Sequence, residues 1–171
     1  MLKKLLKLSL ILIIILFFTS AITIAKESPN DEDIDQARKM VKMLDDLYKT
    51  FIELITEEYV NNPDLLPAAT LSKRVFEVME EKGWHKARLL DATGTPFNPD
   101  NNPKDEFERV AINAFVWGNS YIERVEKLEG KYYLRAATSV TAVTEGCTIC
   151  HTGKKVGDLL GAISYTIPLQ E

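Results

Sequence analysis

The sequence predicts an α+β fold, because helical and strand-like patterns follow one another along the chain. Several segments repeat apolar residues at intervals of three and four, which is the spacing of an amphipathic helix. Two segments in the second half are instead rich in β-branched and aromatic residues and are bounded by turn-forming ones. Strands that follow helices along the chain, with a hairpin-like pair among them, favour an α+β fold over an all-helical one.

The first helix is predicted over residues 34–59, where the sequence is amphipathic. Its inward-facing side chains are expected to be Ile34, Ala37, Val41, Leu44, Tyr48, Phe51, Ile52 and Ile55. The helix is expected to end near Asn62-Pro63, because proline cannot continue a helix. Residues 28–33 (SPNDED), which precede it, are expected to form a short polar linker.

Two further helices and three strands are predicted downstream. The second helix covers residues 68–82, with Gly83 as its stop. The third begins near Asp105, and its inward-facing residues are expected to be Phe107, Val110, Ala111, Ala114, Phe115, Tyr121 and Val125. The predicted strands are 86–92, 132–143 and 161–169, and residues 93–103 are rich in turn formers.

The N-terminus has the three-part layout of a secretory signal peptide. Three lysines form a basic start, residues 8–18 are almost wholly apolar, and Thr23-Ile24-Ala25 offers small residues for cleavage. We therefore expect residues 1–25 to be a signal peptide and residues 26–171 to be a single domain. An uncleaved membrane anchor is the alternative, because residues 5–24 reach the roughly 20 apolar residues that span a bilayer. In both cases the domain is expected in the periplasm or another extracytoplasmic space, soluble after cleavage or anchored by this segment.

The most specific motif is C-x-x-C-H, at Cys147, Cys150 and His151, which is the attachment signature of c-type haem. Each cysteine sulfur can add to one haem vinyl group, and the two-residue gap matches the separation of the two vinyls. The histidine then lies under the iron and supplies its proximal ligand. These three residues are the predicted haem c site, and attachment outside the cytoplasm agrees with an exported chain.

Three other uses of the cysteine pair remain open. A thioredoxin-like redox pair normally begins a helix after a strand, whereas the residues that follow this pair indicate a loop. A zinc site needs two more ligands, and only His85 remains beyond His151. A structural disulfide suits an oxidising compartment, although so small a ring gains little from loop closure.

Charge and composition exclude other classes of function. Three of the 21 Lys and Arg residues lie in the leader, which leaves 18 against 25 acidic residues and a net charge of −7. Nucleic acid is therefore not an expected partner, since phosphate binding needs a basic surface. The sequence has no nucleophile motif and no paired acids that can be assigned to a pocket, so an enzyme is not expected and no catalytic residue is predicted.

A set of short motifs follows in a fixed order from Pro67 to the end. They are Gly83-Trp84, Asn98-Pro99 with Asn101 and Pro103, Phe107-Glu108, the C-x-x-C-H motif, and residues 157–164 (GDLLGAIS). This ordered set resembles the haem-c-binding PAS-like domains of periplasmic sensors and of some standalone exported proteins. It covers roughly 100 residues, within the size of one domain. The resemblance implies a PAS-like antiparallel sheet flanked by helices, preceded by long helices, with covalent haem in a pocket against the sheet.

Most of these motif residues also have a plainer interpretation. Asn98-Pro99 and Asn101 either build turns or lie at the haem edge. Asp158 is expected to cap a turn, and the glycines around it to serve backbone geometry. Lys154-Lys155 either pairs with the haem propionates or is solvated.

The sixth iron position decides the mechanism. Some relatives carry a cysteine or methionine ligand ahead of the Gly-Trp pair, but the equivalent residues 67–70 (PAAT) offer none. The remaining candidates are Met40, Met43, Met79 and His85; a methionine is equally suited to filling a core, and His85 is expected to be exposed. An open sixth position would admit a small gas such as NO or CO, whereas two firm protein ligands favour electron transfer.

Two hypotheses for function follow. The first is an exported monohaem c-type cytochrome that senses redox state or a diatomic gas and acts on a signalling partner through the long first helix. The second is a small periplasmic electron-transfer cytochrome, whose acidic surface would dock on a basic redox partner. The first helix is also a candidate contact for a homodimer.

Overall fold

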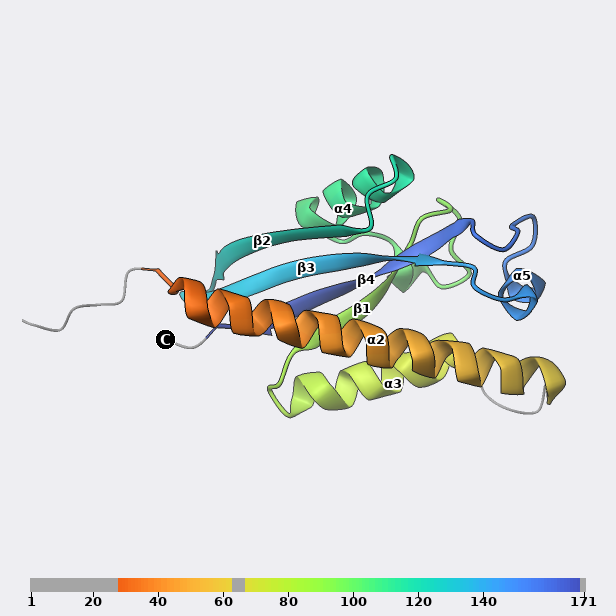
Figure 1. The fold of residues 1–171 in the computed structure, drawn as a ribbon, viewed down its shortest axis with the longest axis horizontal. Helices are drawn as coiled ribbons and strands as arrows, with labels where there is room; N and C mark the ends of the chain where they lie inside the picture. Colours follow the sequence, from red (N-terminus) through yellow and green to blue (C-terminus); the bar gives the residue numbers. More distant parts are fainter. Residues whose placement is uncertain (1–27, 63–66, 170–171) are drawn as a thin grey trace, which may run out of the picture.

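The protein forms a four-stranded antiparallel sheet with helices on both faces in the computed structural model, which describes residues 28–62 and 67–169 (Figure 1). The elements in chain order are α2 (Asp31–Asn61), α3 (Ala68–Glu81), β1 (Lys86–Asp91), the 3-10 helix η1 (Pro99–Asn101), α4 (Glu106–Val116), β2 (Tyr121–Leu128), β3 (Lys131–Thr141), α5 (Glu145–Cys150) and β4 (Leu159–Pro168). The predicted α+β class, antiparallel sheet and long first helix are confirmed.

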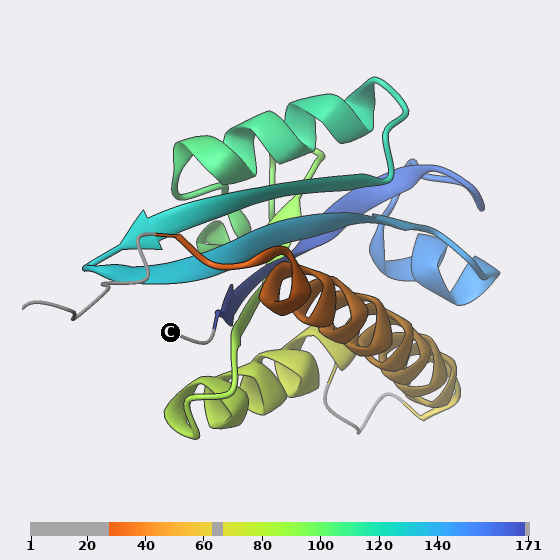
Figure 2. The same cartoon turned by 60° about the vertical axis from the view of Figure 1, so that its left-hand side comes forward.

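The last strand occupies the middle of the sheet. The strand order is β1-β4-β3-β2, so β4 pairs with β1 on one side and with β3 on the other. A hairpin through Glu129-Gly130 joins β2 to β3, and both residues have positive φ, as such a tight turn requires. Helices α2 and α3 cover one face of the sheet, and α4 covers the other (Figure 2).

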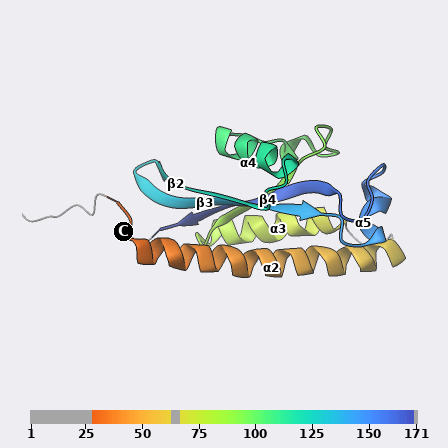
Figure 3. The ribbon, with the colours of Figure 1, turned by 45° about the horizontal axis from the view of Figure 1, so that its top comes forward.

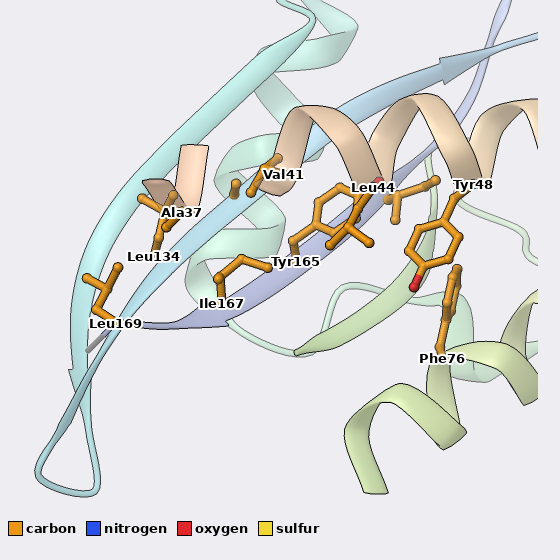
Figure 4. Packing of buried hydrophobic residues seen from close by; sticks show 11 residues of the cluster. Ala37, Val41, Leu44, Tyr48, Phe76, Leu134, Tyr165, Ile167 and Leu169 are labelled. Atoms are coloured by element: carbon orange, nitrogen blue, oxygen red, sulfur yellow. The ribbon is translucent and has the colours of Figure 1, made fainter. Parts of the chain in front are cut away.

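Two apolar clusters hold these layers together, one on each face. The cluster under α2 consists of Ala37, Val41, Leu44, Tyr48, Phe76, Leu134, Ala136, Ile163, Tyr165, Ile167 and Leu169 (Figure 4). The cluster under α4 consists of Leu90, Phe107, Ala111, Phe115, Ala137 and Ala162. Alternate residues of β3 and β4 face opposite sides, so the same two strands supply both clusters.

The polar segment expected before the first helix is in fact its beginning. The side chain of Asn30 accepts a hydrogen bond from the backbone N–H of Asp33 at 2.7 Å and caps the helix. Asp31, Glu32 and Asp33 occupy the first turn, where acidic side chains interact favourably with the helix dipole. The linker prediction over residues 28–33 is therefore wrong for residues 31–33.

The third helix is shorter than predicted, and β2 was not predicted. Gly118 has a φ of 94°, which ends α4, and the chain reverses into a strand. Tyr121 and Val125, which were expected on the inner face of that helix, lie on β2. Val110 was also expected to face inward but is 49% exposed, because only one side of α4 contacts the sheet.

The predicted signal peptide or membrane anchor, residues 1–25, lies outside the residues that the structure describes. None of the described helices is both long enough and apolar enough to cross a membrane. The division into a leader and one domain over residues 26–171 therefore stays a prediction.

Candidate haem-attachment site

The C-x-x-C-H motif lies on the connection between β3 and β4, at the end of the sheet where β1 ends and β4 begins (Figure 1). A short helix, α5, carries both cysteines, and the residues that follow them, 151–158, lie outside helices and strands, as the sequence predicted. The last turns of α2 extend beyond the sheet to the same place (Figure 3). The candidate site is thus built from a surface connection and the far end of the long helix.

A single turn of α5 presents the three motif residues. The backbone N–H of Cys147 donates to the carbonyl oxygen of Thr144 at 3.1 Å, and that of His151 donates to the carbonyl oxygen of Cys147 at 3.0 Å. Cys147 and Cys150 are therefore neighbours on one helix face, three residues apart. His151 follows at the C-cap, where the backbone leaves the helix. The two thiols and the imidazole come from one short, hydrogen-bonded stretch.

At Gly146, α5 packs against the last turns of α2. A Cβ atom at this position would lie 3.5 Å from Cγ2 of Val60 and 3.6 Å from Cγ2 of Thr56. Both side chains belong to the last turns of α2. The turn that bears the cysteines is therefore in direct contact with the long helix, whose earlier turns pack on the sheet.

The far side of the connection is tied back to the sheet. Ala142 forms two backbone hydrogen bonds with the residues just before β4. Its N–H donates to the carbonyl oxygen of Asp158 at 2.9 Å, and its carbonyl oxygen accepts from the N–H of Gly157 at 2.8 Å. The carboxylate of Asp158 accepts from the backbone N–H of Lys155 at 2.9 Å. Asp158 thus caps a turn, as the sequence predicted, and the segment from residue 143 to 156 is held at both ends.

Gly161 has a packing role in the same region. A Cβ atom there would lie 2.1 Å from the carbonyl oxygen of Leu90, which is far too close for any side chain. The glycine lets β4 approach β1 where the two strands pair. The backbone role predicted for this glycine therefore has a specific cause.

The ionisable groups of the motif are in states that suit ligation. Both cysteines are free thiols, Cys147 half-buried and Cys150 exposed, and the hydroxyl of Thr144 lies 3.6 Å from Sγ of Cys147. Burial lowers the pKa of His151; the nearby carboxylate of Asp91 acts in the opposite direction and is the weaker influence. The imidazole is therefore neutral at pH 7, with a nitrogen lone pair available to a metal.

Exposed apolar side chains lie on the same connection as the cysteines. Val143, Ile149 and Val156, all on the connection that carries the motif, are 55, 59 and 46% exposed. Large apolar side chains gathered at one place on a surface commonly mark a binding site. The donor set and this apolar border are together suited to a flat, mostly apolar group with a metal at its centre.

The zinc alternative finds no support in the same residues. Across the described ranges 28–62 and 67–169, no group of three or more His, Cys, Asp and Glu side chains could hold a metal ion. His85, the other histidine, lies in a different part of the fold.

A comparison with protein families matches residues 26–168 to the Tll0287-like family, described as Tll0287. The chain belongs to the Tll0287-like family. Its structure is similar to the crystal structure of the cyanobacterial heme-protein Tll0287, with a TM-score of 0.55 and 18% sequence identity over 83% of this chain and 99% of that chain. At this identity the likeness shows a shared fold. No curated protein matches the chain.

In this Tll0287-like protein, the two methionines on α2 lie away from the motif. Met40 and Met43 are in the first half of the helix, whereas α5 contacts it at Thr56 and Val60. At about 1.5 Å per residue, Met43 and Thr56 are separated by roughly 20 Å along the axis. Met40 packs at the edge of the core and Met43 is 62% exposed. The structure does not bring either to His151.

Met79 and His85 lie at the opposite end of the sheet from the motif. Met79 is near the end of α3, and the chain then passes through His85 into the start of β1. Asp91, which influences His151, is at the other end of that strand. The length of β1 is roughly 20 Å at about 3.3 Å per residue, so neither side chain is near the motif.

The prediction that His85 is exposed is wrong, because it is only 4% exposed. Its Nε2 atom shares a hydrogen bond of 2.9 Å with the hydroxyl of Tyr48, which comes from α2. That tyrosine also packs edge-on against Phe76 of α3. The two helices therefore cover the start of β1, and the histidine serves the core there.

The Asn-Pro loop forms turns and accepts hydrogen bonds from a partly buried ion pair. The Asn98 side chain accepts from the backbone N–H of Asp100 at 2.9 Å, which supports its turn-building interpretation. The guanidinium of Arg88 donates to the carboxylate of Glu108, which is 2% exposed, and to the loop carbonyls of Asp100 and Asn102. Sequence reasoning missed this pairing of β1 with α4, since a lone arginine in a strand gives no sign of its partner.

Proposed function

We propose that the protein is a monohaem c-type cytochrome, with haem attached through Cys147 and Cys150 and with His151 as the proximal iron ligand. Each thiol would add across one vinyl double bond, sulfur to one carbon and hydrogen to the other, so no oxidant is consumed. The observation that carries the proposal is the pair of free thiols on one helical turn, followed at once by a neutral, half-buried imidazole. The structural relative is named a heme-protein, which supports haem as the cofactor.

The side chains around the motif have defined roles in this proposal. His151 keeps its lone pair because burial opposes protonation, and a metal ligand has to be deprotonated. Val143, Ile149 and Val156 would be covered by the cofactor and would exclude water from it. The bound group would supply a redox-active iron that can exchange electrons or take up a small ligand.

We favour redox or diatomic-gas sensing over electron carriage. Within the described residues, none of Met40, Met43, Met79 and His85 lies close to His151, which supports a sixth position open to a small ligand. The contact of α5 with Thr56 and Val60 offers a direct route from the motif to α2. A signalling partner would respond to that helix, and the domain would work outside the cytoplasm. Electron transfer is the alternative, supported by the acidic chain, whose net charge is −4.

Expression in a host that matures c-type cytochromes tests the attachment. Replacing Cys147 or Cys150 with alanine should leave at most one thioether bond, and replacing both should give protein whose intact mass lacks haem. Thr148→Ala changes a residue between them that has no proposed role, so it should keep the full haem mass and serves as the control. A wild-type chain that never gains the mass of a haem would refute the proposal.

Absorbance spectra separate the two functions. The reduced, haem-loaded protein should change its spectrum when CO is added, because a neutral gas binds an iron whose sixth position is open or weakly held. An unchanged spectrum would favour the electron carrier, since two firm protein ligands leave CO no position. His151→Gln should lose the normal spectrum while covalent haem remains detectable by mass, which separates ligation from attachment.

A further inference from the structure

The outward side of α2 carries large apolar side chains that the rest of the described chain leaves uncovered. Met43, Leu47 and Leu54 are 62, 58 and 60% exposed. Their spacing of four and seven residues puts them on one stripe, with Thr50 between them. Figure 3 shows that α2 is the outermost layer on its side of the sheet. The core residues of the same helix, Ala37, Val41, Leu44 and Tyr48, lie about a third of the way around it from the stripe.

Charged residues flank this stripe in a pattern that changes sign along the helix. Lys39 and Lys42 lie toward the N-terminal end, and Glu53 and Glu57 lie toward the C-terminal end, on the same side of the stripe. Among residues 28–62 and 67–169, none of these four side chains forms an ion pair. The other basic side chains of the helix, Arg38 and Lys49, are paired within the chain. These four charges border an uncovered apolar stripe, with Asp46 between them on the same side, exposed and without an ion pair in the described part of the chain.

We propose that a second copy of this chain covers the stripe, with the two α2 helices antiparallel about a two-fold axis at the level of Tyr48. Lys39 precedes this level by nine residues and Glu57 follows it by nine, so the two lie opposite each other across the axis. Lys42 precedes this level by six residues and Glu53 follows it by five, so these two also lie opposite each other to within one residue. Two-fold symmetry makes every contact twice, which gives four ion pairs around the apolar centre.

The apolar residues match in the same register. Met43 precedes the axis by five residues and Leu54 follows it by six, so each would pack on the other in the partner helix. Leu47 would lie beside Thr50 of the second copy near the centre. Contacts at intervals of four and three residues are those of helices that pack side by side. The matched stretch from Lys39 to Glu57 is roughly 27 Å long at about 1.5 Å per residue.

A parallel pair is disfavoured by the same charges. In a parallel two-fold pair, each flank of one helix lies against the opposite flank of the other, so Lys39 and Lys42 would not meet the two glutamates and the four ion pairs would be lost. Charges beside an apolar stripe commonly decide the orientation of paired helices. A membrane surface is a poorer occupant, because anionic lipids would repel the acidic half of the helix.

The antiparallel pair would hold the two C-x-x-C-H motifs far apart. Because α5 contacts α2 at Thr56 and Val60, about ten residues beyond the axis, the motifs would lie roughly 30 Å apart along the helices. Neither motif takes part in the contact. The dimer therefore does not rest on haem, and it should form with or without attachment.

Light scattering of the purified protein, with and without attached haem, tests the dimer. The wild type should have the mass of two chains, and Leu47→Glu should have the mass of one. Val110→Glu is the matched control, because Val110 is 49% exposed on α4, on the other face of the sheet; it should stay dimeric. Circular dichroism of all three should be alike. A monomeric wild type, or a Leu47→Glu protein that dimerises normally, would overturn the proposal.

Charge reversal tests the antiparallel register. Lys39→Glu alone and Glu57→Lys alone should each weaken dimerisation by about tenfold or more, since each puts like charges together twice. The double variant Lys39→Glu/Glu57→Lys should restore the wild-type affinity, because it only exchanges the two partners. A parallel dimer would show no such restoration. Single variants that dimerise as well as the wild type would refute the ion pairs.

Discussion

His85 is a buried histidine, and a protonated, positively charged imidazole would be unfavourable among its neighbours. Its Nε2 atom is hydrogen bonded to the hydroxyl of Tyr48, and that ring is itself packed against Phe76 and stacked on Tyr165. Burial lowers the pKa of His85 below its ordinary value of about 6.5. The folded protein therefore holds this imidazole neutral under conditions in which the unfolded chain protonates it.

The buried state of His85 predicts a loss of stability in mild acid. As the pH falls below about 6.5, the unfolded chain binds a proton that the folded state resists, so the free energy of unfolding should decrease, by at most about 1.4 kcal/mol per pH unit from this group. The loss should continue until the lowered pKa of the folded state is reached. Urea denaturation between pH 7 and pH 5 measures it. The His85→Gln variant should show a shallower pH dependence, and equal slopes for both proteins would contradict the prediction.

The pairing of β1 with β4 depends on one close backbone approach. At Gly161 a Cβ atom would lie 2.1 Å from the carbonyl oxygen of Leu90, and backbone cannot yield as a flexible side chain can. Gly161→Ala should therefore force the strands apart and destabilise the protein by roughly 2–3 kcal/mol. Gly146→Ala is the matched control, since its Cβ would meet its neighbours at 3.4–3.6 Å. Chemical denaturation should place the control near the wild type, and equal losses in both variants would rule out the clash with Leu90 as the cause.

The accuracy of the sequence predictions varied between elements for physical reasons. The first two helices were predicted well, because an apolar stripe with helical spacing is a local property of the chain. β2 was missed because it is an edge strand with alternating charges, and Tyr121 and Val125 continue the helical spacing past Gly118. The burial of His85 was missed because Tyr48 comes from 37 residues earlier in the chain. Local sequence patterns were sufficient to predict the amphipathic helices. They were insufficient where a residue far away in the sequence determines the structure.

The same distinction applies to the candidate site. The cysteines and histidine were identified from their spacing alone, since that spacing is what the attachment chemistry requires. The packing of the motif against α2 was not predicted, because the contact of Gly146 with Thr56 and Val60 joins segments that are far apart in the sequence. The placement of the methionines likewise needed the fold. The chemistry proposed for the site could therefore be inferred from the sequence, whereas the connection of the site to the rest of the molecule could not.

At the scale of the whole molecule, the motif is separate from what holds the fold together. Both apolar clusters lie between the sheet and its helices, and no residue of the segment from 143 to 158 belongs to either one. The segment is fixed only at its ends and along α2. A change at the motif can therefore reach the long helix without first disturbing the sheet, as the proposed sensing function requires.

This separation predicts that the protein folds without the proposed haem. The double variant Cys147→Ser/Cys150→Ser should keep the circular dichroism of the wild type, because neither cluster loses a contact. Hydrogen exchange followed by mass spectrometry should show β3, β4 and α4 protected within about tenfold of the haem-loaded protein, and a larger loss over residues 143–158 and the last turns of α2. Thr148→Ala, which keeps both thiols, is the control and should match the wild type throughout. If protection fell across the whole sheet instead, haem would be part of the folding core, and the route from the motif to α2 would have no independent basis.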